Sequence, residues 1–179
     1  MKILKAISLL ILALLITSCS NNSAMKPEDF KNKEPRLIIE EYLSGNVKAW
    51  GVLQNRSGKV TRQFSADLDG TWDGKQLILK EKFNWDDGEV QDREWTITKI
   101  DEHNYEGTAG DVVGKAIGYS YGPAFKFEYV LLVPVKGREL KITFDDWIFK
   151  QDERVAINRA TMTKFGFKVA ELTVVFVKD

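Results

Sequence analysis

The run Asp145, Asp146 and Trp147 is the densest group of residues that could do chemistry in this sequence. Adjacent residues of a strand point to opposite faces of a sheet, and Asp146 shares the parity of the apolar residues Ile142 and Phe144. We therefore expect Asp146 to face the protein interior and Asp145 to face solvent. A buried carboxylate needs hydrogen-bonding partners or a raised pKa, so Asp146 either belongs to a structural ion pair or contacts a ligand.

Three polar residues on other strands could be the partner of Asp146: Arg159, Asn158 and Arg93. Other catalytic groups are scarce, because His103 is the only histidine and Cys19 the only cysteine. The usual zinc sites and thiol chemistry lack their residues, and a Ser-His-acid triad would depend on a histidine that lies in a polar turn. The segment 67–70 lacks the full calcium-loop pattern. We predict no catalytic residue, no metal site and no cofactor, and we favour a protein that is not an enzyme.

Cys19 stands where a lipid anchor would be attached. Lys2 and Lys5 precede an apolar run over residues 6–16, which is shorter than the ~20 residues of a membrane-spanning helix and typical of a secretory signal peptide. Ile16-Thr17-Ser18-Cys19 resembles a bacterial lipobox, in which the cysteine is acylated and becomes the mature N-terminus. The alternative is a plain signal peptide with an incidental cysteine. The predicted division is a signal peptide over 1–18, a lipidated cysteine and tether over 19–26, and one domain over 27–179.

Charge and sorting signals point to the cell envelope. Ser20 rather than Asp follows the cysteine, which resembles the pattern for the outer membrane of Gram-negative bacteria, so we expect an anchor in its inner leaflet and a domain facing the periplasm. The 26 basic and 26 acidic residues balance and form no basic run. Nucleic-acid binding is therefore disfavoured, and the predicted membrane attachment is the lipid on Cys19 rather than a polybasic segment.

The elements that would position these residues are strands separated by short polar turns. One helix is predicted within residues 26–45, with Pro35 in its first turn and Gly45 at its end. Short connections force antiparallel neighbours, which predicts an all-β fold, either a sandwich or an up-and-down barrel of about ten strands. The predicted strands cover residues 47–55, 60–72, 75–85, 90–100, two glycine-rich strands within 105–121, 125–135, 140–149, 154–163 and 167–177.

Aromatic residues are spread over most of these strands. Large rings that face a barrel interior either fill it or line a pocket for an apolar ligand, and the sequence leaves both possibilities open. The strands are charged on one face throughout, as at Glu81 and Arg93, which argues against a transmembrane barrel. If a pocket exists, the residues predicted to line it are Trp50, Trp72, Trp95, Phe127 and Phe144, with Asp146 and Arg159 orienting a polar head group.

Several linked motifs resemble a bacterial lipoprotein family catalogued as domain-of-unknown-function family 3833. They occur over roughly residues 30–176, and they are Gly-Asn-Val-Lys-Ala-Trp-Gly (45–51), Asp-Gly-Thr-Trp (69–72), Glu-Gly-Thr-Ala (106–109), Phe-Asp-Asp-Trp (144–147), Asn-Arg (158–159) and Lys-Phe-Gly-Phe (164–167). The resemblance implies a calycin-type, lipocalin-like barrel. It carries over no catalytic residue and favours an apolar ligand.

The sequence therefore predicts a lipid-anchored, periplasm-facing barrel that binds or carries a hydrophobic ligand, such as a modified fatty acid or another envelope lipid. A second hypothesis is an envelope assembly lipoprotein that binds a protein partner through its outer face. A third is a lipid-modifying enzyme that uses a barrel carboxylate such as Asp146.

Overall fold

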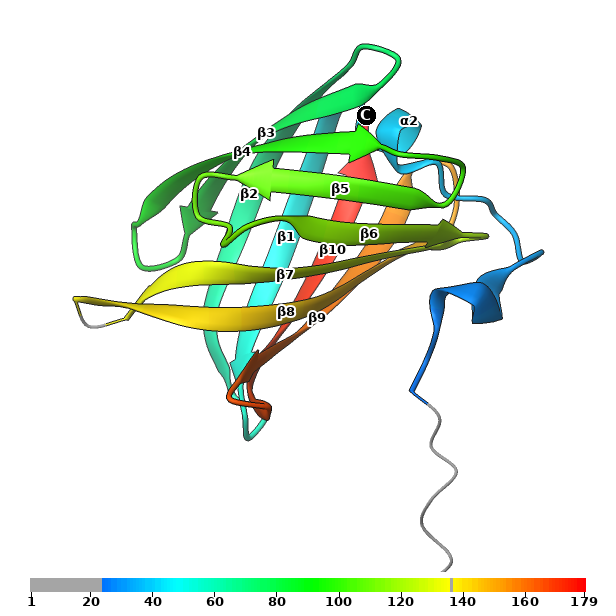
Figure 1. The fold of residues 1–179 in the computed structure, drawn as a ribbon. Helices are drawn as coiled ribbons and strands as arrows, with labels where there is room; N and C mark the ends of the chain where they lie inside the picture. The colour runs from blue at the N-terminus through cyan, green and yellow to red at the C-terminus, as the bar shows by residue number, and fades with distance from the viewer. Residues whose placement is uncertain (1–23, 136) are drawn as a thin grey trace, which may run out of the picture.

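A computed structural model describes residues 24–135 and 137–179 as a closed barrel of ten antiparallel strands (Figure 1). The predicted signal peptide and the predicted lipid site at Cys19 lie outside the described residues. Two short helical elements precede the barrel: a 3-10 turn, η1 (Pro27–Phe30), and a single α-helical turn, α2 (Ile39–Tyr42). The strands are β1 (Gly45–Asn55), β2 (Val60–Trp72), β3 (Gln76–Trp85), β4 (Val90–Lys99), β5 (Asn104–Ala109), β6 (Ala116–Tyr121), β7 (Ala124–Val135), β8 (Arg138–Lys150), β9 (Val155–Lys164) and β10 (Phe167–Lys178).

The predicted all-β up-and-down barrel is confirmed. Each strand pairs with its neighbour in sequence, and β1 pairs with β10 to close the barrel. The turns fall where the sequence placed them, because glycines with positive φ occupy them, as Gly74 and Gly88 do. Such residues favour tight hairpins over longer crossovers, so the chain meanders around the barrel in order.

The glycine-rich strands β5 and β6 let large rings approach their backbone. A Cβ atom on Gly107 would lie 2.4 Å from Cζ of Phe127, and one on Gly118 would lie 2.9 Å from Cζ of Phe125. Both distances are too short for real contacts, so these two positions cannot carry a side chain without moving a ring. The glycines therefore set where the two phenylalanines lie inside the barrel.

The predicted helix over residues 26–45 is wrong in its extent. The chain bends at Glu34 and Pro35 and has no regular secondary structure at Leu37, and only α2 is α-helical. Leu37 is fully buried, its N–H donates to the Gly122 carbonyl over 2.8 Å, and its own carbonyl accepts from Ser120 Oγ at 3.0 Å. Because the backbone of this segment bonds to the barrel, it does not form the internal hydrogen bonds of a helix.

The end of the barrel next to α2 is closed. The helix and its flanking residues bury Ile39, Tyr42 and Leu43 against the core. Lys178 at the end of β10 donates from Nζ to the carbonyls of Glu41, Tyr42 and Ser44 over 2.9, 2.9 and 2.6 Å. These are carbonyls of the C-terminal turn, which has no partners within the helix, so the lysine fixes the helix across the barrel end.

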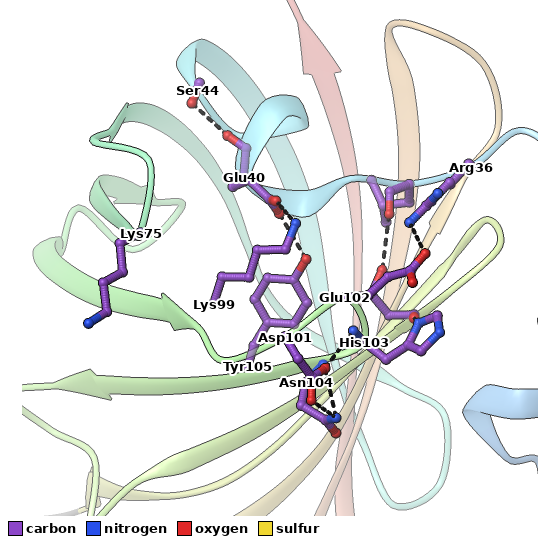
Figure 2. Close-up of polar contacts among 12 residues, drawn as sticks. Arg36, Glu40, Ser44, Lys75, Lys99, Asp101, Glu102, His103, Asn104 and Tyr105 are labelled. Carbon is purple, nitrogen blue, oxygen red and sulfur yellow. Dashed lines mark hydrogen bonds and ion pairs between the residues drawn. The ribbon is translucent and has the colours of Figure 1, made fainter.

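Glu40 ties the same helix to the strands below it (Figure 2). Its carboxylate lies 2.5 Å from Lys99 Nζ and accepts from Tyr105 Oη over 2.9 Å. Burial, reinforced by the Glu40 charge, raises the pKa of Tyr105 above its ordinary value. Glu40 is only 4% exposed, so this charged cluster is part of the closure. Within the described residues, no helix has the length and apolar character needed to cross a membrane.

Candidate functional site

The barrel contains a cavity of about 410 Å³ that runs from α2 toward the opposite end. This volume lies within the range of small-molecule pockets, ~300–1,000 Å³. Residues near α2, such as Ile39 and Ile97, are buried, whereas Arg62, Trp85 and Gln91 at the far end are partly exposed. The alternative that side chains fill the lumen is therefore wrong for this barrel, and its far end is called the open end below.

Alternation along each strand decides which side chains reach the cavity. In β3 the lining residues are Leu79, Glu81, Phe83 and Trp85, with the residues between them facing outward. The same period of two residues places Arg93 and Trp95 of β4 inside. On these two strands, Glu81 and Arg93 thus enter the cavity wall because they share the parity of its aromatic residues.

A continuous group of aromatic rings forms the middle of the wall. The Trp95 ring lies 5.2 Å from that of Phe127 and 5.3 Å from that of Tyr129, measured between centroids. The Tyr129 ring stacks on that of Phe144 at 5.0 Å. Rings in mutual contact have few alternative rotamers, so they form a rigid apolar surface that needs little reorganisation when a ligand binds.

Asp146 lies in this wall and has two hydrogen-bond donors. Tyr129 Oη donates to Asp146 Oδ2 over 2.9 Å, and Asn158 Nδ2 donates to Asp146 Oδ1. Burial raises the pKa of Asp146 to about 6, although both hydrogen bonds act to lower it. Burial and the neighbouring Asp146 raise the pKa of Tyr129 well above its ordinary value. Asp146 is therefore a carboxyl group that can hold a proton close to neutral pH.

A second polar cluster joins Glu81, Arg93 and Asp111. Arg93 donates to Asp111 Oδ2 from Nε over 3.0 Å and from Nη2 over 2.8 Å, and its Nη1 lies 3.8 Å from Glu81 Oε2. Burial raises the pKa of Glu81 to about 7, despite the opposing effect of Arg93, and the nearby Asp146 charge raises it further. Of Glu81 and Asp146, Glu81 is thus the more readily protonated.

Some buried polar atoms of the cavity residues have no hydrogen-bond partner within the described part of the chain: Glu81 Oε2, Asp111 Oδ1 and Arg62 Nε. Buried polar atoms in native proteins are nearly always hydrogen-bonded, so these three atoms leave hydrogen-bonding capacity unused beside the cavity. The two carboxylate oxygens would accept from a hydroxyl or N–H group, and the arginine nitrogen would donate to an oxygen.

Arg62 lies at the open end and is held there by three groups. Its Nη2 is 2.7 Å from Asp87 Oδ1 and 2.9 Å from Glu89 Oε2, and its guanidinium carbon is 3.9 Å from the centre of the Trp85 ring. The cation–π contact and the ion pairs fix the guanidinium. A polar group thus lies where a ligand would enter or leave.

The arrangement suits binding of a mainly apolar molecule with a few hydrogen-bonding groups. The aliphatic and aromatic lining would cover its apolar part, and the polar clusters would orient it. Carboxyl groups with raised pKa values can also transfer protons. Among residues 24–135 and 137–179, no three His, Cys, Asp or Glu side chains are grouped as metal ligands would be.

Four of the seven residues predicted for the pocket line the cavity: Trp95, Phe127, Phe144 and Asp146. Trp50 and Arg159 do not, because each lies on the outward parity of its strand. The Trp50 side chain is 50% exposed, and Arg159 pairs with Glu171 across 3.7 Å at the surface. Trp72 ends β2 and is partly buried against the core without lining the cavity. Whether the lining residues bind a ligand remains a prediction.

Glu81 and Arg62 were not predicted for the site, and Arg93 was predicted only as a possible partner of Asp146. The signal was present in the sequence, because Glu81 shares the parity of Leu79 and Phe83. It was obscured by the charged residues that flank it on both sides. His103 has a local role, since its Nδ1 lies 2.9 Å from the Ser120 carbonyl and its ring stacks on Tyr121.

Solved structures of other proteins share the barrel fold of this chain. The S-type phycobiliprotein lyase CPES from Guillardia theta superposes with a TM-score of 0.58 at 11% identity, over 78% of this chain and 90% of the lyase. A protein of unknown function from the DUF3598 family of Nostoc punctiforme superposes with a TM-score of 0.60 at 16% identity, over 82% of this chain and 51% of that one. At such identities the likeness concerns the fold alone.

Sequence comparison identifies the family. No curated protein matches the chain. The family described as protein of unknown function (DUF3833) matches residues 13–178, which includes every strand of the barrel. The motifs that resembled this family in the sequence lie within that range, and the chain therefore belongs to the DUF3833 family.

Proposed function

We propose that this protein binds a hydrophobic small molecule, such as a modified fatty acid or another envelope lipid, inside its barrel. The observation that carries the proposal is the cavity of about 410 Å³, which has an aromatic wall and unpartnered polar atoms at Glu81 and Asp111. An apolar cavity of this size is costly to leave without contacts. A ligand with at least one hydrogen-bond donor would match the apolar wall and the free carboxylate oxygens together.

Native mass spectrometry of the processed protein, purified gently from its own cell envelope, tests the proposal. We expect a reproducible added mass, and extraction should identify it as a lipid-like molecule. A bare protein mass from a folded sample would refute ligand binding. It would favour the second hypothesis, in which the outer face binds a protein partner, and cross-linking in the envelope would then be the next experiment.

A matched pair of valine substitutions shows whether the added mass resides in the cavity. Val133 lines the cavity toward the open end, whereas Val175 lies on the outer face of β10 and is 39% exposed. Val133→Trp should reduce the loaded fraction at least tenfold, because the larger ring occupies the ligand's space. Val175→Trp should leave it unchanged. Equal loading of the two variants would place the ligand elsewhere.

We further propose that Cys19 is acylated and anchors the domain at the inner leaflet of the outer membrane. The support is the lipobox-like run Ile16-Thr17-Ser18-Cys19, followed by Ser20. Mass spectrometry of the N-terminal peptide should show a diacylglyceryl group on Cys19 and no residues before it. An unmodified cysteine, or cleavage at another bond, would remove this proposal and leave the cavity proposal intact. Separation of the two membranes tests the location.

Two of the carboxyl groups that line the cavity have raised pKa values, and they favour a catalytic role as a second candidate function. Glu81, with a pKa of about 7, and Asp146, with a pKa of about 6, could act as general acid and base at neutral pH. Incubating the extracted molecule with the protein and with Glu81→Gln or Asp146→Asn tests this role. Conversion by the wild type alone would support an enzyme, and an unchanged molecule would support a carrier.

A further inference from the structure

The turns at the open end carry exposed apolar side chains. Phe165 and Phe167 in the β9–β10 turn are 88% and 73% exposed. Val60 next to the β1–β2 turn and Val135 next to the β7–β8 turn are also exposed. Because β1 pairs with β10, the β1–β2 and β9–β10 turns lie side by side at the opening, whereas the β7–β8 turn projects away from them (Figure 1). Single exposed apolar residues need no explanation, but a group of them beside the cavity opening does.

Phe165 is unusual in its backbone as well as in its exposure. Its φ is 51°, and it precedes Gly166 with φ of 79°. Two positive φ values characterise a tight hairpin turn in which Asn or Asp, followed by Gly, is preferred. A phenylalanine at the first position is unfavourable for the turn, and its ring is not buried in the core. Strained, exposed positions of this kind often have a binding role.

Basic residues flank the two phenylalanines in the chain and in the adjoining turn. Lys164 ends β9 and its Nζ lies 5.3 Å from the centre of the Phe165 ring, and Lys168 is the second residue of β10 and pairs with Glu171 over 2.8 Å. Arg56 and Lys59 lie in the β1–β2 turn. No basic run exists in the sequence, so it is the pairing of β1 with β10 that brings these four residues to one side. Aromatic rings flanked by cations are suited to the interface of a bilayer with anionic headgroups.

The N-terminal segment runs toward the same end of the barrel. The Phe30 ring packs on Trp147 and Phe149 on the outer face of β8, at 6.0 and 5.5 Å. Six residues earlier, Ala24 lies in a surface groove formed partly by Asp145 and Thr161, farther from α2. Cys19 is five residues before Ala24, and five extended residues span at most ~17 Å. An acyl group there would hold this side of the barrel close to the bilayer.

From these observations we infer that the open end of the barrel docks on a phospholipid bilayer. Phe165 and Phe167, called the docking pair below, enter the interface, and Lys164, Lys168, Arg56 and Lys59 contact anionic headgroups. The inference rests on the proposed function and extends it: the cavity opens onto the membrane surface, so an apolar ligand moves between bilayer and barrel without crossing water. The closed end with α2 faces away from the membrane.

Photo-crosslinking in living cells tests this inference on the complete chain. A benzoylphenylalanine residue placed at position 165 should form adducts with phospholipid on irradiation. The matched control position is Ile100, which is 55% exposed and follows β4 at the closed end. Adducts are identified by mass spectrometry on the peptide that contains the photoreactive residue, which separates them from any acyl group at Cys19. We expect at least tenfold more phospholipid on the peptide from position 165.

Three results would overturn the inference, and a fourth measurement separates it from the proposed cavity function. Equal lipid adducts at 165 and 100, or no lipid at either, would overturn it. Adducts with a protein at position 165 would also overturn it and assign the docking pair to a protein interface. Val133→Trp in the same background should leave the phospholipid adduct in place while emptying the cavity. If the wild type forms the phospholipid adduct at position 165 but is never found with a ligand, the docking inference stands and only the proposed cavity function is refuted.

Discussion

Glu81 is a carboxylate buried in the cavity wall, and replacing it with Gln removes its charge while nearly preserving its shape. Only 12% of its side chain is exposed, and its nearest cation is Arg93 at 3.8 Å. The glutamine corresponds to the protonated state that burial already favours. The substitution therefore measures how much the ionised form destabilises the barrel.

The magnitude follows from the shift in pKa. Burial raises the pKa of Glu81 from its ordinary value of 4.5 to about 7. At about 1.4 kcal/mol per pKa unit, the ionised form lowers the free energy of unfolding by about 3 kcal/mol. Between pH 4.5 and 7 the folded protein binds a proton that the unfolded chain has lost, so this contribution makes stability fall as pH rises. Above pH 7 the free energy of unfolding is lowered by this full amount, and below pH 4.5 it is not lowered at all.

Urea unfolding followed by tryptophan fluorescence at pH 4.5, 6 and 8 measures the effect. We expect Glu81→Gln and the wild type to have nearly equal free energies of unfolding at pH 4.5, with a gap of about 3 kcal/mol in favour of the variant at pH 8. The matched control is Glu94→Gln on the outward face of β4, for which we expect no gap at either pH.

The difference in free energy of unfolding between Glu81→Gln and the wild type, followed against pH, tests whether the pKa of Glu81 is raised. A gap that stays constant from pH 4.5 to 8 would mean that Glu81 does not change its protonation state in this range. A variant less stable than the wild type at pH 8 would mean that the ion pair with Arg93 outweighs the cost of burial. Either result would refute the raised pKa of Glu81 and the catalytic candidate that depends on it.

Three further substitutions test other parts of the structure. Phe165→Asn should raise the free energy of unfolding by up to ~1 kcal/mol, because Asn tolerates positive φ better than Phe, while reducing phospholipid contact; a less stable variant in urea unfolding would contradict this. Gly107→Ala should cost about 1–3 kcal/mol and reduce ligand loading in native mass spectrometry, because the new methyl group would lie 2.4 Å from the Phe127 ring; unchanged loading would count against it. Glu40→Ala should cost about 2–3 kcal/mol, since the buried Tyr105 hydroxyl loses its acceptor; a thermal unfolding curve identical to that of the wild type would disprove the role of this cluster.

The sequence by itself determined the strands and their order. Glycine-containing turns and period-two alternation are local features, and short connections leave antiparallel pairing as the available geometry. For this reason β2 was predicted over its observed residues, and the barrel and the inward direction of Asp146 were predicted correctly. The family was also recognisable from motifs alone. The predicted acylation of Cys19 is likewise local, and it stays a prediction.

Only the tertiary structure decided what the strands enclose. Whether aromatic rings fill a lumen depends on distances across the barrel, and alternation along one strand contains no such information. The same reason applies to the partners of Asp146, which are Tyr129 and Asn158 from the two adjacent strands, and to the pairing of Arg93 with Asp111. The chain around Leu37 is not helical because its backbone partners lie about 80 residues away in sequence. Residues that are distant in the chain meet only when the barrel closes, so the cavity and its polar clusters belong to the fold.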